Sequence, residues 1–103
     1  MAVHAEISII PISSGSSMSK EVAAAFTAIS RTEGVKATLT ALGTQLEGRD
    51  LDAVLAAVRA AHDAAKSSAG VARVISTVRI DERLDKDQTL EDKVRSVEKE
   101  LGS

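Results

Sequence analysis

The sequence of 103 residues predicts a single α+β domain, residues 1–103, in which two strand–helix–strand units are interleaved and a further helix follows. Three observations predict this class. Apolar and polar residues alternate with a period of two in four segments, as in β-strands. In three other segments apolar residues recur every three or four positions, as in helices. The segments follow one another in the order β-α-β-β-α-β-α.

Residues 3–12 form the first predicted strand. Apolar residues occupy its odd positions, and polar residues occupy most of its even positions. Pro11 has no amide hydrogen to donate to a sheet, so it marks the end of this strand or an edge position. Ser19 is expected to cap the following helix. The apolar stripe of that helix comprises Val22, Phe26 and Ile29.

Residues 36–42 and 44–47 alternate again and are expected to form a hairpin that turns near Leu42 and Gly43. Asp50 is then expected to cap a long helix, because an aspartate at this position can accept the free amides of the first turn. The apolar stripe of this helix is predicted to be Leu51, Val54, Leu55, Val58, His62 and Ala65.

The last strand is predicted at residues 71–81. A final helix is expected to begin at Thr89, because Thr89 and Asp92 have the spacing of a capping box. Its narrow apolar stripe comprises Leu90, Val94, Val97 and Leu101. Glycines follow all three helical patterns, where a left-handed residue commonly ends a helix. These are Gly34, Gly70 and Gly102.

Two interleaved units with right-handed crossovers give a ferredoxin-like βαββαβ sandwich with an additional C-terminal helix and an antiparallel sheet of strand order 4-1-3-2. The two main helices then cover one face of the sheet. Glu6 and Glu47 are expected to be neighbours on the open face, with Arg79 or Arg73 within reach. The other residues predicted on that face are His4, Ser8, Ile10, Thr38, Thr40, Leu42, Gln45, Ile75 and Thr77.

The open face combines charged and apolar residues. Two explanations are considered, a solvated surface and an interface between two copies. The first is a solvated sheet surface with cross-strand ion pairs. Association of two copies, sheet on sheet or edge to edge, is favoured, because a domain of this size gains from burying more surface. Contact would remove Glu6 and Glu47 from water, and each would then need an arginine, several donors or a bound cation. Glu6 is therefore expected to recognise a ligand that carries donors or positive charge.

A serine-rich loop, residues 13–17, precedes the first predicted helix. Its hydroxyl and amide groups suit an anion or the polar edge of a ligand. A capped loop without a ligand is the simpler explanation when the serines are considered alone.

Three stretches of the sequence resemble the YkoF-like, MTH1187-type family of small thiamine-binding proteins, and together they span essentially the whole chain. They are AEISIIPISSGSSMSKEV, LTALGTQLEGRDLDAVL and GVARVISTVRIDERLDKDQTLEDKV. The resemblance implies a ferredoxin-like fold, assembly into dimers and usually tetramers, and binding of thiamine or its hydroxymethylpyrimidine part without catalysis. It also implies ligand contacts from Glu6, Ser8, Gly15, Ser16, Thr40, Thr44 and Glu47.

Several functional classes lack support in the sequence. The chain has no cysteine and two distant histidines, and no phosphate-binding loop or zinc-protease motif occurs, so no metal or cofactor is expected. A net charge of −2 with a single aromatic residue argues against nucleic-acid binding. No apolar run reaches the roughly 20 residues of a membrane span, and the N-terminus does not resemble a signal peptide. A cytoplasmic location is therefore expected.

Two alternatives to a thiamine-like ligand remain open. One is an enzyme that uses Glu6 and Glu47 as an acid–base pair, although no nucleophile, metal set or cofactor motif accompanies them. The other is a regulatory or structural oligomer that binds another protein or a different small polar ligand.

Overall fold

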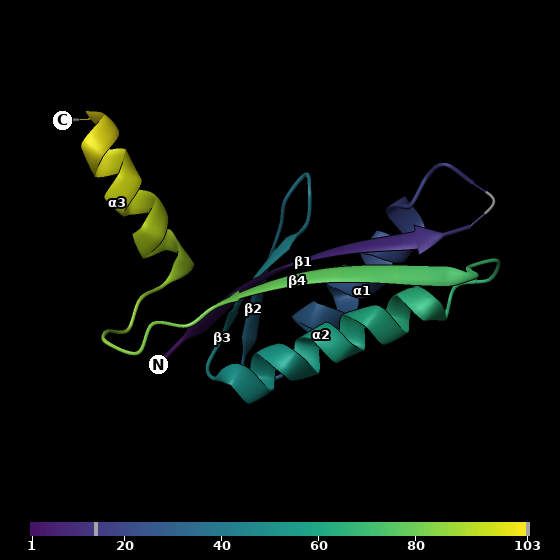
Figure 1. The fold of residues 1–103 in the computed structure, drawn as a ribbon, viewed down its shortest axis with the longest axis horizontal. Coiled ribbons are helices and arrows are strands. Elements are labelled where there is room, and N and C mark those ends of the chain that lie inside the picture. The colour runs from purple at the N-terminus through teal and green to yellow at the C-terminus, as the bar shows by residue number, and fades with distance from the viewer. Residues whose placement is uncertain (14, 103) are drawn as a thin grey trace.

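The computed structural model describes residues 1–13 and 15–102 of the chain. Ser14 of the serine-rich loop lies outside the described residues. No helix within the described ranges is both long and apolar enough to cross a membrane. The elements follow the predicted order (Figure 1): β1 (Val3–Ile12), α1 (Ser19–Ser30), β2 (Val35–Leu39), β3 (Thr44–Gly48), α2 (Leu51–Lys66), β4 (Arg73–Asp81) and α3 (Leu90–Gly102).

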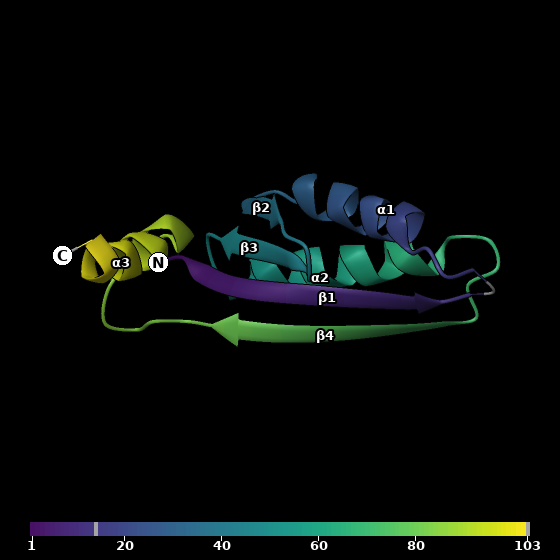
Figure 2. The ribbon, with the colours of Figure 1, turned by 90° about the horizontal axis from the view of Figure 1, so that it is seen from above.

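The four strands form one antiparallel sheet of order β2-β3-β1-β4, which confirms the predicted ferredoxin-like topology. The central strand β1 pairs with β4 from His4 to Ile12, but with β3 only from Val3 to Ile7. Beyond Ile7, β1 therefore has β4 on one side and no strand on the other. Figure 2 shows β4 at the edge of the sheet beside β1.

The core lies between the sheet and the two helices that cover one of its faces. Val3, Ala5 and Ile7 of β1 and Leu46 of β3 are buried there. Helices α1 and α2 pack against each other and against this face. The residues that the alternation placed on the covered face of β1 are therefore the ones that form the core.

Helix α2 buries a different stripe from the one predicted. Val54 and Ala65 are buried as expected, but Leu51 is exposed and Leu55 is 47 % exposed. The buried face consists mainly of Ala53, Ala57, Ala61 and Ala65, which recur every four residues. Small side chains allow α2 to lie close to both α1 and the sheet, and the larger Leu55 lines a hollow beside β4.

The predicted N-terminal caps of the last two helices are confirmed. The amide of Ala53 donates to Asp50 Oδ1 at 2.8 Å, so Asp50 caps α2. Thr89 and Asp92 form the capping box of α3, with Thr89 N to Asp92 Oδ2 at 2.9 Å and Asp92 N to Thr89 Oγ1 at 3.0 Å. The backbone hydrogen bond to Asp92 is the main reason that its pKa lies below its ordinary value.

Two predictions about helix ends are wrong. Ser19 is the first residue of α1 rather than its cap, and the cap position belongs to Met18, whose side chain accepts no hydrogen bond there. Gly34 and Gly70 have the expected left-handed φ of 80° and 82°. Gly102 is instead the last residue of α3, because the helical hydrogen bonding continues to the end of the apolar pattern.

Helix α3 projects from one end of the sheet, away from α1 and α2 (Figures 1 and 2). None of its described residues is buried. Leu90 of its apolar stripe is half-buried, and the other three stripe residues are exposed by between 58 % for Val94 and 82 % for Leu101. This stripe therefore has no counterpart to cover it within the described part of the chain.

Candidate functional site

The open face of the sheet carries the pair that the sequence predicted around Glu6. The β1–β4 register places Glu6 opposite Arg79, and Arg79 Nη2 donates to Glu6 Oε1 at 3.4 Å. Arg73 is instead opposite Ile12, six residues farther along β1, so it lies outside the reach of Glu6. Arg73, the alternative partner of Glu6 predicted from the sequence, is therefore excluded.

Glu47 lies close to Glu6 but has a different hydrogen-bond partner. Glu6 is opposite Gln45 and Glu47 is opposite His4, so the two carboxylates are diagonal neighbours, as predicted. The backbone amide of Leu90 donates to Glu47 Oε1 at 2.7 Å. Glu47 thus accepts one of the free amides at the N-terminus of α3, a contact between residues 43 positions apart that periodicity does not reveal.

His4 and Asp81 complete the polar end of the open face. His4 is only 5 % exposed, and its Nε2 has no hydrogen-bond partner among the described residues. This nitrogen lies 3.9 Å from Glu47 Oε1. On β4, Asp81 Oδ2 accepts a hydrogen bond from Lys93 Nζ of α3 at 2.7 Å. That hydrogen bond and the charge of Lys93 hold the pKa of Asp81 below its ordinary value.

At the opposite end, a pocket of about 270 Å³ lies between β1, α1 and the β2–β3 turn. It occupies the gap where β1 has no strand on one side. Its lining includes three residues with hydroxyl groups, Ser8, Thr40 and Thr44, and Thr44 is only 6 % exposed. The other walls are aliphatic or backbone, and comprise Ile7, Ile9, Ile10, Met18, Val22, Ala25, Ile29, Leu39, Ala41, Leu42 and Gly43.

The β2–β3 turn forms one wall of this pocket and is fixed tightly against β1. Both the amide and the hydroxyl of Thr40 donate to the carbonyl of Gly43, at 2.9 Å and 2.6 Å. A Cβ at Gly43 would lie 2.9 Å from the carbonyl oxygen of Ile7 and 3.6 Å from Glu6 Cγ. The turn therefore requires glycine, and the stem of Glu6 lies beside the pocket.

The seven predicted ligand residues fall into three places. Ser8, Thr40 and Thr44 line one pocket, with Glu6 next to it. Glu47 is at the polar end, under α3. Gly15 and Ser16 belong to the exposed loop between β1 and α1 and do not line the pocket.

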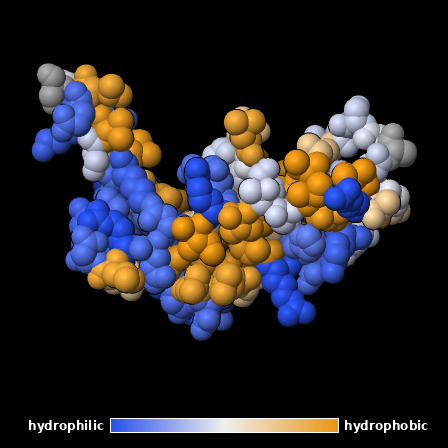
Figure 3. Space-filling model, in the orientation of Figure 1, coloured by the Kyte–Doolittle hydropathy of each residue, from blue (hydrophilic) through white to orange (hydrophobic). Residues whose placement is uncertain are grey.

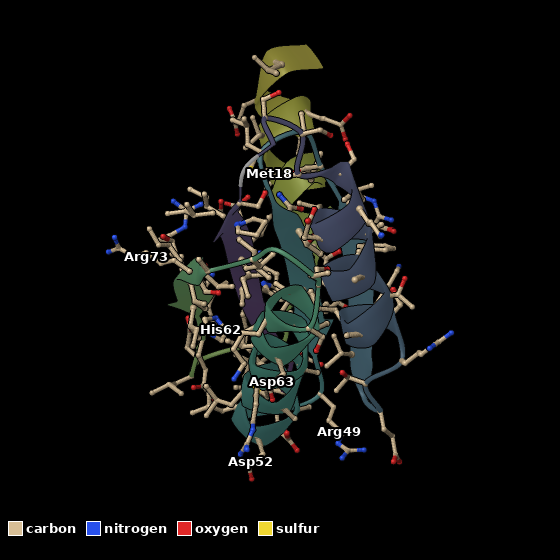
Figure 4. All side chains as sticks on the ribbon, turned by 90° about the vertical axis from the view of Figure 1, so that its right-hand side faces the viewer. Met18, Arg49, Asp52, His62, Asp63 and Arg73 are labelled. Carbon is tan, nitrogen blue, oxygen red and sulfur yellow. The ribbon has the colours of Figure 1, made fainter. Side chains whose placement is uncertain are left out.

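A second polar pair lies on the helix-covered side, between α2 and the β4 edge. His62 Nδ1 and Ser76 Oγ are 2.6 Å apart. Figure 4 shows His62 directed from α2 toward β4. His62, which the helical pattern placed on the apolar stripe of α2, therefore has a polar partner on β4. No group of three or more metal-ligating side chains gathers within residues 1–13 and 15–102.

Comparisons with known proteins extend these observations. The sequence model of the family described as thiamine-binding protein matches residues 5–98. A UPF0045 protein of Methanothermobacter thermautotrophicus is 42% identical over 100 residues, which cover 96% of this chain and 99% of the relative.

Solved structures agree with this result. The crystal structure of the hypothetical protein MJ1052 of Methanocaldococcus jannaschii superposes with a TM-score of 0.85 at 41% identity, covering 94% of this chain and 96% of that one. A Thermotoga maritima protein named for thiamine biosynthesis or salvage has a TM-score of 0.77 over 94% of this chain and 99% of its own, and at 20% identity it shows the fold alone. The family match and the identity over almost the whole chain show that this chain belongs to the thiamine-binding protein family.

Proposed function

We propose that this protein binds thiamine, or its hydroxymethylpyrimidine part, without catalysing a reaction, and that it acts as a homo-oligomer. The observation that carries the proposal is the pocket beside β1 in a member of this family. Its lining includes three residues with hydroxyl groups, Ser8, Thr40 and Thr44, among apolar side chains. An apolar pocket with a few convergent polar groups is the usual form of a small-molecule site.

The hydroxyl groups match the edge of an aminopyrimidine. Such a ring has an amino group that donates and ring nitrogens that accept. A free hydroxyl can do either, whereas the Thr40 hydroxyl, which donates to the Gly43 carbonyl, can only accept. The volume of about 270 Å³ lies just below the range of roughly 300–1,000 Å³ for drug-sized ligands. The pocket therefore suits a single ring better than both rings of thiamine, so we place the pyrimidine inside and the thiazolium at the mouth.

Glu6 is positioned to meet the positive charge of the thiazolium. Its stem lies beside the Gly43 turn, and among residues 1–13 and 15–102 the partner of its carboxylate is the exposed Arg79 at 3.4 Å. Exposed ion pairs contribute about 0–1 kcal/mol, so exchanging Arg79 for a cationic ligand costs little. Three other predicted ligand contacts have weaker support: Glu47, Gly15 and Ser16. Glu47 already accepts a hydrogen bond from the Leu90 amide, and Gly15 and Ser16 lie in an exposed loop.

No observation favours the alternative of an acid–base enzyme. Glu6 is paired with Arg79, and Glu47 is hydrogen-bonded to the backbone of α3, so each carboxylate has its own partner. Glu6 and Glu47 thus make separate contacts on the open face.

Isothermal titration of the purified protein with thiamine and with hydroxymethylpyrimidine tests the proposal. Both are expected to bind, and Thr44→Val should weaken both. Glu6→Gln should weaken thiamine binding by up to about fivefold and binding of the uncharged pyrimidine much less, because only thiamine carries the thiazolium charge. The melting temperature of each variant serves as the folding control. Absence of both heat and a melting shift at millimolar concentrations of either ligand would refute the proposal.

A further inference from the structure

Strand β4 has an unpaired edge along its whole length. All nine of its residues, Arg73–Asp81, are paired with β1 on one side. Within residues 1–13 and 15–102, no strand pairs with its other side, and Figure 2 shows this edge on the outside of the sheet. Alternate residues of an edge strand direct their amide and carbonyl groups away from the sheet. The β4 edge therefore presents a row of free backbone donors and acceptors.

The other edge strand, β2, is protected in ways that β4 is not. Strand β2 has five residues and includes Lys36, and short length and lysine both discourage pairing at an edge. Strand β4 is longer and contains neither lysine nor proline. Its half-buried residues on the helix side, Val74, Ser76 and Val78, carry no charge. The β4 edge is thus open to an added strand.

A hollow of about 660 Å³, the β4 groove, lies between this edge and α2. Leu55 and Val58 of α2 and Val78 of β4 give it an apolar lining. Figure 3 shows apolar side chains gathered over β4 and the adjoining part of α2. In a strand added to β4, every second side chain would point to the helix side of the sheet and cover this lining.

A polar position interrupts the apolar lining of the β4 groove. His62 Nδ1 lies 2.6 Å from Ser76 Oγ, and both residues line the groove. The other ring nitrogen, His62 Nε2, has no hydrogen-bond partner among the described residues. A hydroxyl or carboxyl side chain next to Ser76 on an added strand can therefore bond to this nitrogen.

The charge of the groove favours an acidic partner. Arg73 lines the end where β4 begins, and it makes no hydrogen bond or ion pair with any residue in 1–13 and 15–102. Arg59 lines the helix side and lies 3.6 Å from Asp63. Asp63 is closer to Lys66, at 3.0 Å, and Lys66 is the main reason that the pKa of Asp63 is below its ordinary value. Two arginines are thus available to an acidic side chain.

We propose that β4 binds an extended segment of another protein as an added strand, with alternate apolar side chains in the β4 groove and an acidic side chain at Arg73. The free backbone groups require an extended chain, and the arginines determine its charge. The β4 edge and the ligand pocket lie on opposite sides of β1. This binding site is therefore separate from that of the proposed function.

A second copy of the chain matches this edge less well. If two β4 strands paired antiparallel about their middle residue, Arg73 of one copy would lie opposite Asp81 of the other. Asp81 already accepts a hydrogen bond from Lys93 at 2.7 Å. The same register places Ile75 opposite Arg79, an apolar side chain against a charged one. A segment of different sequence avoids both conflicts.

Selection from a displayed library of random nine-residue peptides tests the proposal on the full chain. The selected peptides are expected to alternate apolar and polar residues and to carry an acidic residue near one end. Leu55→Lys should weaken their binding at least about tenfold, because it places a charge in the apolar part of the groove. Ala56→Lys is the matched control, because Ala56 is the next exposed residue of α2 and does not line the groove.

The melting temperatures of both variants report whether they fold, and the exposure of Leu55 makes a loss of folding unexpected. Failure to enrich such peptides above a selection on an unrelated protein would overturn the inference. Equal binding of the selected peptides to Leu55→Lys and Ala56→Lys would also overturn it.

Charge reversal at the end of the groove tests the placement of the acidic residue. A selection repeated on Arg73→Glu is expected to yield lysine or arginine at the position where the wild type selects an acidic residue. A preference for acidic residues that persists in Arg73→Glu would overturn the inference.

Hydrogen exchange of the β4 amides shows whether a selected peptide pairs as a strand. The peptide should slow the exchange of every second β4 amide, those directed away from β1, at least about tenfold. Binding that protects no β4 amide would overturn the inference. Protection that is already present without peptide and is lost on dilution would show a second copy on this edge, and would overturn it as well.

Discussion

The two ends of the open sheet face differ in what their side chains contact. At the polar end, His4, Glu47 and Asp81 come from three neighbouring strands, and two of them hold α3. At the apolar end, Ser8 and Ile10 have a strand on one side only, and a pocket occupies the other side. The comparison shows how one face of a small sheet can anchor a helix at one end and leave a pocket at the other.

The length of β3 produces this difference. Because β3 pairs with β1 only as far as Ile7, the sheet narrows beyond that residue, and the β2–β3 turn fills part of the space. A β3 strand that continued along β1 would close the pocket. A substitution that affects one end should therefore leave the other end largely unchanged.

The largest effect is expected from Gly43→Ala at the apolar end. The new Cβ would lie 2.9 Å from the carbonyl oxygen of Ile7, so the turn must move away from β1 and deform the pocket. Stability should fall by about 1–3 kcal/mol, and hydroxymethylpyrimidine should bind at least about tenfold more weakly. Denaturant unfolding and calorimetric titration measure the two effects. Gly15→Ala, whose Cβ would have no atom within 4 Å, is the control. Equal behaviour of the two variants would contradict the role of the turn.

The next effect is expected from Glu47→Ala at the polar end. The variant loses the acceptor of the Leu90 amide, so the first turn of α3 should weaken by about 1 kcal/mol. Faster hydrogen exchange of the Leu90 amide would report this change. Binding of hydroxymethylpyrimidine should change less than the exchange does. Lost binding with unchanged exchange would show instead that Glu47 is a direct ligand contact.

A smaller effect, of opposite sign, is expected from His4→Leu. The buried Nε2 has no hydrogen-bond partner among the described residues, and an unsatisfied buried polar atom costs about 1–3 kcal/mol. Replacing it with an apolar group should leave the free energy of unfolding unchanged or raise it by up to about 1 kcal/mol. His62→Leu is the contrasting variant, because it removes the 2.6 Å contact with Ser76 and should destabilise the domain. Equal losses in both variants would show that His4 has an important partner.

The smallest effect is expected from pH. Lys93 lowers the pKa of Asp81, and a carboxyl with a lowered folded pKa contributes stability above its unfolded pKa of about 3.9. That contribution is complete at neutral pH and is lost as the pH falls through the lower folded value. Amide exchange in α3 should therefore increase below about pH 4 more in the wild type than in Lys93→Gln. The same acid response in both proteins would show that this contact does not hold α3.

The fold and the faces of the strands were predictable because they depend on local periodicity. Alternation in residues 3–12 alone separates Val3, Ala5 and Ile7 of the core from Glu6 and Ser8 of the open face. Strand order follows from connection rules, which also brought Glu6 and Arg79 together. These predictions require no knowledge of how side chains pack.

The predicted apolar stripe of α2 was wrong, because the close packing of the helix determines which of its residues are buried. Apolar periodicity gives weight to large residues such as Leu55, but the helix approaches its neighbours through Ala57 and Ala61. The contact between Glu47 and Leu90 was missed for another reason. It joins a strand to a helix end far along the chain, and no local pattern encodes that distance.

The aliphatic pocket has an optical consequence. Its described walls contain no aromatic side chain, and the sequence has no Trp, no Tyr and a single Phe. The protein is therefore almost transparent in the near ultraviolet, and a heteroaromatic molecule held beside β1 would dominate that part of the spectrum. Its absorption and emission would report the surroundings of the guest itself, free of energy transfer to tryptophan or tyrosine.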